Sequence, residues 1–428
     1  MAARVIGRDG DEITIAVTVK VNGPMLHAEE AILTATNEVG TVATAEALKQ
    51  FDADGEPIIL GDIKWYARET HAKYYQTPYG EVIVNRWVYQ KAGGGKTFCP
   101  LEHGARILRN ATPRLAKMVS HKLAQEAALD VQRDLEENHG RPTSKLLVQE
   151  LGAYVSAVVQ AKEENWTYAT PMLEADIATV GIGIDGSCML MCEGQWREAM
   201  TGSISLYDRA GERQHTIYVG AAPEHGKTRF HERMAREIAH VRQLYPEARY
   251  VGIADGAQSN WDFLAPHVDE QILDFYHATE YVTRVADALF GSGPPQARHA
   301  WLEAHCSMLK NDWNGAATML QEWEAIDGHA WNKARRQALG EGIRYFRNHL
   351  HQMHYKRYGD MGMPIGSGVT EAACKTLVKQ RLCQSGMRWK EKGAQVILSL
   401  RALLLTQTRW SQFWRKLEQY GAPVLDHY

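Results

Sequence analysis

Three carboxylates stand in sequence contexts that would let them act together on a phosphodiester. Asp185 closes an apolar, strand-like run at residues 180–186, and Asp255 closes a second such run at 250–256. Glu371 comes later, where a stretch with Gly and Ser gives way to a helix-forming segment that becomes strongly basic. Two strands and one helix are expected to deliver these acids. The combination indicates metal-dependent cleavage of DNA.

The residue types suit hard divalent cations. Transfer of a phosphodiester is commonly served by two Mg²⁺ ions about 3.5–4 Å apart, which activate the attacking oxygen and stabilise the leaving oxygen. Such ions take oxygen ligands, so Asp and Glu are expected in place of His or Cys. A site of this kind would consist of an aspartate on a central strand, a second aspartate on an adjacent strand and a Glu on a helix. Taken singly, an Asp after a strand is more often a turn former or a helix cap.

The elements that must position these acids follow a β-β-β-α-β-α-β order. Strands are predicted at 179–185, 196–207, 213–221, 249–255 and 271–276, and helices at 228–244 and 259–266. This order would put the strands of Asp185 and Asp255 side by side. A long helical block is predicted from about 278 to 358, and a basic helical tail from 370 to 418.

Several segments carry a specific resemblance. They are residues 79–82, 100–102, 183–186, 253–257, 274–277, 366–371 and 386–389. These segments resemble those of bacterial insertion-sequence transposases of the Kra type, in the RNase H-like Asp-Asp-Glu superfamily. The resemblance covers most of the chain and implies that Asp185, Asp255 and Glu371 are the catalytic acids and the ligands of two Mg²⁺ or Mn²⁺ ions.

The same resemblance implies the fold. We expect an α/β protein with an RNase H-like catalytic domain, built on a mixed five-stranded sheet with flanking helices and interrupted by an all-α insertion. A β-hairpin and a helical DNA-binding region are expected to precede it. The expected domains are 1–105 (β-rich, with a short helical stretch near 42–52), 106–170 (helical, with a helix-turn-helix), 171–277 and 361–428 (catalytic), and 278–360 (insertion).

Asp274 and His277 match the Asp-x-x-His signature of related transposases with such insertions. Asp274 is predicted to end the fifth strand. His277 is predicted to be catalytic, approaching the scissile phosphate or positioning the attacking water. The alternative is a strand-end acid beside a neutral, hydrogen-bonded histidine.

Basic residues near Glu371 are expected to contact DNA phosphates. They are Lys375, Lys379, Arg381 and Arg388, and Trp389 either stacks on a base or packs the helix. On a helix, Lys375 and Lys379 would share a face with Glu371. Solvated surface charge is the alternative.

A second group of DNA contacts is expected in and beside two helices predicted at 112–138 and 143–162, whose pattern is that of a helix-turn-helix. They are Arg114, Lys117, Arg141 and Lys145, together with Arg106, Arg109 and Lys122. A helical hairpin used for dimerisation would give the same pattern.

The composition limits how the protein can bind DNA and where it can reside. The net charge of −3 means that DNA binding must rest on local basic patches. Six scattered cysteines without a CxxC pair disfavour a zinc ribbon and a disulfide framework, which indicates an intracellular protein. With no signal peptide and no membrane span, we expect a cytoplasmic, nucleoid-associated bacterial protein.

The predicted function is therefore that of a transposase which binds the ends of its element and cleaves and joins double-stranded DNA, active as a homodimer. One rival is a transposase-derived DNA-binding protein or a nuclease without transposition activity. A glycoside hydrolase with two carboxylates is a second rival, which would need neither metal nor a basic helix.

Overall fold

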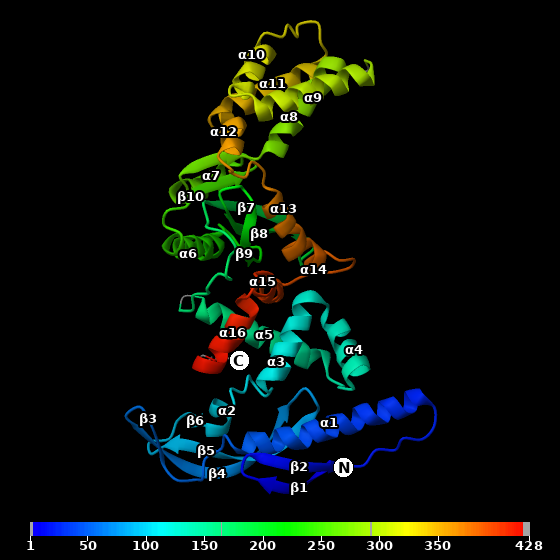
Figure 1. The fold of residues 1–428 in the computed structure, drawn as a ribbon, viewed down its shortest axis with the longest axis vertical. Helices are drawn as coiled ribbons and strands as arrows, with labels where there is room; N and C mark the ends of the chain where they lie inside the picture. Colours follow the sequence, from blue (N-terminus) through cyan, green and yellow to red (C-terminus); the bar gives the residue numbers. More distant parts are fainter. Residues whose placement is uncertain (1–2, 164, 292, 423–428) are drawn as a thin grey trace. The chain divides into compact units, whose positions relative to one another are not determined.

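The computed structural model describes residues 3–163, 165–291 and 293–422, and these residues form two compact units. The described residues of the first unit come from Met1–Trp166, Ser399–Leu404 and Arg409–Tyr428 (Figure 1). The second unit comprises Thr167–Leu398 and Leu405–Thr408.

The first unit begins with β-structure and one long helix. Strands β1 (Ala3–Asp9) and β2 (Glu12–Val17) form an antiparallel pair. Helix α1 (Met25–Lys49) is much longer than the short helical stretch predicted near 42–52. Strands β3 (Ile58–Leu60), β4 (Ile63–Gln76), β5 (Glu81–Lys91) and β6 (Thr97–Phe98) form an antiparallel sheet in that order. The pairing of Tyr75 with Val82 confirms the predicted hairpin.

Helices complete the first unit. They are α2 (Pro100–Gly104), α3 (Pro113–Gln125), α4 (Ala128–His139), α5 (Lys145–Lys162) and α16 (Arg409–Tyr420). The single helix predicted at 112–138 is wrong, because Glu126 and Ala127 both have extended backbone angles and separate α3 from α4. Helix α5 begins after Ser144, whose hydroxyl accepts from the Leu147 amide and caps the helix.

The C-terminal segment does not belong to one unit as predicted for 361–428. In α16, Phe413, Trp414 and Leu417 form a buried stripe. The ring of Phe413 lies against Trp166, with 5.8 Å between ring centroids. The predicted catalytic segment therefore contributes 399–404 and 409–422 to the first unit, because the apolar face of α16 is covered there.

The second unit is built on a mixed five-stranded sheet in the order β11-β10-β7-β8-β9. Its strands are β7 (Thr179–Leu190), β8 (Trp196–Tyr207), β9 (Arg213–Ala221), β10 (Arg249–Ala254) and β11 (Glu270–Leu273). Strands β7, β8 and β9 are antiparallel neighbours, whereas β10 lies parallel to both β7 and β11. Strand β11 ends before the predicted boundary at 276, since Asp274 caps the next helix.

Helix α6 (Thr228–Leu244) covers one face of this sheet. Its buried residues Phe230 and Met234 approach Gly202 of β8 so closely that a β-carbon there would lie 2.6 Å from Met234 Sδ. Helix α7 (Gln258–Leu264) and a 3₁₀ turn (Ala265–His267) connect β10 to β11. The inward side chains Val180 and Ile182 of β7 are fully buried, which places the core of the unit around the central strand.

An all-helical segment follows β11. It contains α8 (Phe275–Phe290), α9 (Pro295–Asn311), α10 (Gly315–Glu324), α11 (Lys333–His349), a 3₁₀ turn (Leu350–Gln352) and α12 (Tyr355–Asp360). The described residues between 278 and 360 include no strand, as predicted. The helical segment leaves the sheet and returns to it at adjacent backbone positions, because Phe275 N donates to Ile365 O over 3.0 Å.

The chain then returns to the sheet through helix α13 (Gly368–Ala373), a π-helical turn (Cys374–Lys379) and α14 (Gln380–Leu382). Helix α15 (Glu391–Leu405) follows. The π-helical turn interrupts the regular helix predicted after 370. Such turns add a residue to the helix and are frequent at functional sites.

Candidate active site

Asp185 of β7 lies level with two aspartates that directly follow the neighbouring strands β10 and β11. The register pairs Ile253 of β10 with Gly183 of β7, so Asp255 falls opposite Asp185 two residues later. It also pairs Ala254 with Leu273, so Asp274 falls opposite Asp255. Strands β10 and β11 end at this level, whereas β7 continues to Leu190, so the acids lie beside the carboxyl ends of two parallel strands, a common place for binding sites. The expected adjacency of the strands that carry Asp185 and Asp255 is confirmed.

Glu371 reaches the same edge on α13. The preceding residue, Thr370, covers Gly183 of β7, where a β-carbon would lie only 2.0 Å from Thr370 Oγ1. The Thr370 hydroxyl is also 2.7 Å from the hydroxyl of Ser203 on β8. Helix α13 therefore rests on β7 and β8, two residues from Asp185 along β7. Gly183 makes this close approach possible.

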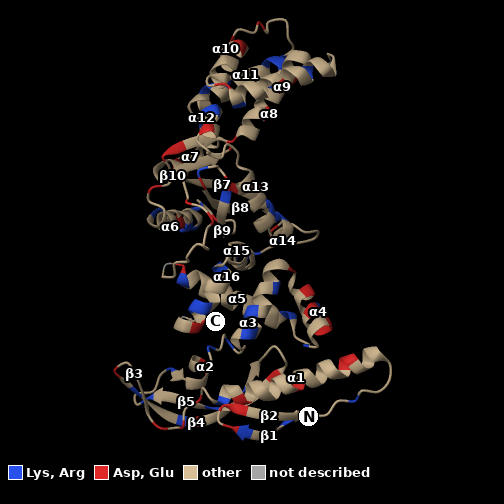
Figure 2. Cartoon of the chain, viewed as in Figure 1, with Lys and Arg blue, Asp and Glu red and all other residues tan. Residues whose placement is uncertain are grey.

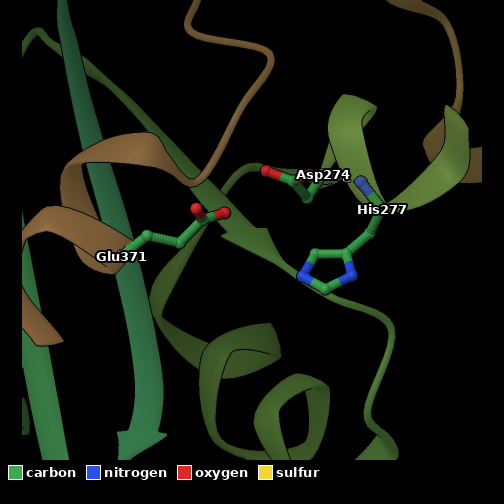
Figure 3. A group of neighbouring side chains, drawn as sticks. All are labelled: Asp274, His277 and Glu371. Atoms are coloured by element: carbon green, nitrogen blue, oxygen red, sulfur yellow. Dashed lines mark hydrogen bonds between the residues drawn. The ribbon is translucent and has the colours of Figure 1, made fainter. Parts of the chain in front are cut away.

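Glu371 lies beside the Asp-x-x-His pair. One potential ligand atom from each of Asp274, His277 and Glu371 lies within 4.8 Å of the others. Figure 3 shows the carboxylate of Glu371 directed toward Asp274 and His277, which come from the start of α8. Among the described residues, this is the group whose spacing would suit a cation, and it differs from the predicted trio of Asp185, Asp255 and Glu371.

Internal hydrogen bonds explain this difference. Asp185 Oδ1 accepts from the Gly186 amide (2.7 Å), and its Oδ2 accepts from the Cys374 thiol (3.4 Å). Asp255 Oδ1 accepts from the Ala257 amide (3.1 Å) and from Asn260 Nδ2 (3.2 Å). These donors are neighbours of each acid. They hold the two carboxylates in their present orientations, and without a cation like charges favour separation.

Asp274 is completely buried and has two backbone partners. Its Oδ1 accepts from the His277 amide (2.7 Å), which caps α8, and its Oδ2 accepts from the Ser367 amide. The Ser367 hydroxyl in turn donates to Glu371 Oε1 (2.9 Å). Asp274 thus holds the start of α8 beside the residue that precedes α13, and Ser367 connects it to Glu371.

His277 and Glu371 are the accessible members of the group. The His277 side chain is 37% exposed and its Nδ1 lies 3.8 Å from Glu280 Oε2. Glu371 is exposed. Asp274 has a structural role as the N-cap that follows β11, whereas His277 presents its ring toward the group.

The electrostatics at Asp185 are those of an acid-rich site. Burial raises the pKa of Asp185, and the charges of Asp255 and Glu198 raise it further, against the lowering effect of its two hydrogen bonds. Burial also raises the pKa of the Cys374 thiol to about 11, so the thiol keeps its proton and can donate. A cation bound here would relieve the repulsion among the carboxylates.

Tyr345 of α11 connects the helical segment to this edge. Its hydroxyl donates to the carbonyl oxygen of Asp255 over 2.8 Å, and its ring stacks on Tyr281 of α8. Burial raises the pKa of Tyr345, with further contributions from Tyr281 and Asp255. The all-helical segment therefore contributes directly to the position of the second acid.

Oxygen donors of this kind fit Mg²⁺ or Mn²⁺. Asp185, Asp255 and Glu371 offer only carboxylate oxygens, which hard cations prefer. Glu371 is exposed, and Asp185 and Asp255 are half-buried, so the donors are reachable. Each acid keeps lone pairs beyond those used in its present hydrogen bonds.

Of the DNA contacts predicted after Glu371, some have exposed side chains and one is buried. Lys375, Lys379 and Arg388 are exposed, and Figure 2 shows Lys and Arg along the α13–α14 segment. Arg381 is 2% exposed, and its guanidinium lies 5.4 Å from the centroid of the Trp389 ring. Arg381 is therefore wrong as a phosphate contact, because its side chain is enclosed by the protein.

Trp389 has a structural role. Its Nε1 donates to Leu382 O over 2.8 Å, and its backbone bonds to Leu190 and Cys192 next to the end of β7. The indole is half-buried. Of the two predicted roles for Trp389, packing of the helix is the one that these contacts support.

The contacts predicted in the first unit need a similar revision. Arg141 is 6% exposed and donates to the carbonyl oxygens of Thr77 and Pro142 and to Gln76 Oε1, so it is wrong as a phosphate contact. Arg114 and Lys145 are exposed and Lys117 is half-buried.

The other three basic residues proposed there have partners within the unit. Arg106 donates to the carbonyl oxygen of Glu418, Arg109 pairs with Glu150, and Lys122 pairs with Asp134. The charged residues of helix α4 are mainly acidic (Figure 2). Arg114, Lys117 and Lys145 therefore remain as the predicted phosphate contacts of this unit.

One contributor to the site had no recognisable signal in the sequence. Cys374 contacts an acid that is distant along the chain, and it lies outside the segments that carry the resemblance. Only the fold brings Cys374 to Asp185.

Comparisons with known proteins assign no family. No protein-family model matches the sequence, and no curated protein matches it either. Among the described residues, every helix is too short or too polar to cross a lipid bilayer.

Proposed function

We propose that this chain is a DNA transposase that binds the ends of its element and catalyses phosphodiester cleavage and strand transfer. The observation that carries the proposal is the grouping of acids beside the ends of two parallel strands. Asp185 of β7 lies level with Asp255 and Asp274, which directly follow β10 and β11, and Glu371 approaches the same region on α13. A structural role alone would not require so many carboxylates at one place.

The second unit is proposed to be an RNase H-like catalytic domain with a helical insertion. Two features support this. The central strand β7 pairs antiparallel with β8 on one side and parallel with β10 on the other, and the helical segment begins and ends at adjacent backbone positions. The Asp274 carboxylate holds both ends of that segment, so the insertion leaves the sheet edge intact.

Asp185, Asp255 and Glu371 would hold two Mg²⁺ or Mn²⁺ ions. When bound, the ions would supply charge neutralisation at the phosphate and activation of the attacking oxygen. The chain's own residues provide the geometry. The amide of Gly186 and the thiol of Cys374 orient Asp185, Asn260 orients Asp255, and Ser367 orients Glu371.

DNA would be held by the exposed lysines next to Glu371. Lys375 and Lys379 stand four and eight residues after the third acid, so their ammonium groups are suited to contact phosphates near the one that reacts. His277, half-exposed beside Glu371, is suited to accept or donate a proton at the reacting oxygen. We assign it that role and assign Asp274 to the support of both helices.

The proposal is tested with DNA that carries the sequences flanking the gene, including any inverted repeats. The purified chain should nick this DNA at the repeat ends in Mg²⁺ or Mn²⁺, and EDTA should abolish the reaction. Binding of the ends without cleavage in either cation would favour a transposase-derived DNA-binding protein. Cleavage without joining would favour a nuclease, and hydrolysis of glycosides in EDTA would favour the glycosidase.

A further inference from the structure

The side chain of Cys374 lies against the first of the three acids. Its Sγ donates to Asp185 Oδ2 over 3.4 Å, and the residue is 3% exposed. Cys374 opens the π-helical turn that directly follows α13, three residues after Glu371. One short segment therefore supplies both the third acid and a hydrogen-bond donor to the first.

Each oxygen of Asp185 then has one partner. The Gly186 amide, from the adjacent residue, binds Oδ1 over 2.7 Å. A contact with the next amide along the chain fixes only one end of the carboxylate. The Cys374 thiol fixes the other end, and it comes from the helix that must be correctly seated for Glu371 to reach the site.

The chemistry of a thiol suits orientation better than ligation here. A thiol is a weak donor and a soft, small side chain, and Mg²⁺ strongly prefers oxygen. Groups that orient a metal-binding side chain typically change cation affinity by about 10- to 100-fold when they are removed. A cysteine that served only to fill space would leave cation affinity unchanged when replaced by another small residue.

We propose that Cys374 is a positioning residue whose thiol holds Asp185 Oδ2 in the orientation needed to bind a divalent cation. The inference rests on the proposed function, since it requires Asp185 to be a cation ligand. The inference goes further, because it links the position of the helix that carries Glu371 to the orientation of the Asp185 carboxylate.

The test measures Mn²⁺ binding to the full chain without DNA, by electron paramagnetic resonance of free Mn²⁺. Cys374→Ala removes the donor and should weaken binding about tenfold. Cys374→Ser keeps a donor of similar size and should stay within about twofold of the unchanged chain. Cys383→Ala is the matched control, because Cys383 is exposed and donates to the Cys188 carbonyl away from Asp185. Its binding should be unchanged.

Thermal unfolding of each variant without cation separates orientation from packing. Equal Mn²⁺ affinity for Cys374→Ala and the unchanged chain would overturn the positioning role while leaving the proposed function intact. If Cys374→Ala and Cys374→Ser both weaken Mn²⁺ binding equally, in proportion to their loss of stability, the positioning role is overturned and Cys374 serves only to pack the core. If the unchanged chain and Asp185→Asn both bind no Mn²⁺, the cation site itself fails, and the positioning role fails with it.

Discussion

The carboxylate of Asp274 accepts a hydrogen bond from the backbone amide of Ser367, although a whole helical segment separates the two residues. The other oxygen of Asp274 accepts from the His277 amide over 2.7 Å. One buried acid therefore holds the point where the chain leaves the sheet and the point where it returns to carry Glu371.

Replacing Asp274 by Asn should destabilise the second unit. An Asn side chain offers one acceptor oxygen, so one of the two amides would face an NH₂ group and lose its partner. The expected loss is about 1–3 kcal/mol in the free energy of unfolding, measured by urea denaturation. Asp262→Asn on the exposed face of α7 is the control and should be neutral. Equal stability of Asp274→Asn and the unchanged chain would contradict the role assigned to Asp274.

Gly183→Ala should displace α13. The added β-carbon would lie 2.0 Å from Thr370 Oγ1, so the helix that carries Glu371 must move or the strand must bend. We expect a loss of about 1–3 kcal/mol in unfolding free energy together with reduced DNA cleavage. Gly340→Ala in α11 is the control, where a β-carbon meets nothing within 4 Å. It should be neutral or stabilise by up to about 1 kcal/mol. Normal stability and cleavage in Gly183→Ala would show that the close approach is not required.

Lys375 and Lys379 should contribute to DNA affinity through charge. The double variant Lys375→Gln, Lys379→Gln should weaken binding uniformly across sequences and reduce the slope of log affinity against log salt by about two. Fluorescence anisotropy over a salt series measures this slope. Lys310→Gln, on an exposed position of α9, is the charge-matched control for one lysine. An unchanged slope in the double variant would remove these lysines from the DNA interface.

His231 should make the second unit less stable in mild acid. Burial lowers the pKa of His231, and the charge of Lys227 lowers it further, while its ring stacks on Phe263 with centroids 4.6 Å apart. A histidine with a lowered folded-state pKa contributes stability above its unfolded pKa of about 6.5 and loses it as the pH falls through the folded value.

The variant His231→Phe keeps an aromatic ring that cannot be protonated. Its stability relative to the unchanged chain should therefore rise between pH 7.5 and pH 5, as followed by urea denaturation. His299→Gln, on an exposed side chain of α9, should show no such trend. If the difference between His231→Phe and the unchanged chain is the same at both pH values, the histidine is not held neutral by the fold.

Much of the sheet could be predicted from local sequence. The strands at 196–207 and 213–221 have the predicted bounds, because alternation and turn residues mark both ends. The structure also explains why glycine follows both Asp185 and Asp255. A β-carbon at Gly186 would lie 2.1 Å from Glu198 Oε1, and Gly256 has a φ of +95° that favours glycine.

Tertiary contacts decided what the sequence could not. Arg141 and Arg381 carry the charge expected of phosphate contacts, yet both are buried, and sequence patterns do not distinguish a buried arginine from an exposed one. The break between α3 and α4 falls at Glu126 and Ala127, neither of which is a helix breaker. The contact of Cys374 with Asp185 joins two segments that share no pattern.

The central claim is tested most directly by measuring both DNA cleavage and DNA binding by the Asp185→Asn variant. Asparagine is isosteric but lacks the charge that a cation requires. We expect cleavage of end-bearing DNA in Mg²⁺ to fall to background while the dissociation constant for the ends stays within about twofold. Asp262→Asn serves as the surface control and should cleave normally. Cleavage and strand transfer by Asp185→Asn at the rate of the unchanged chain would contradict the proposed metal-dependent site.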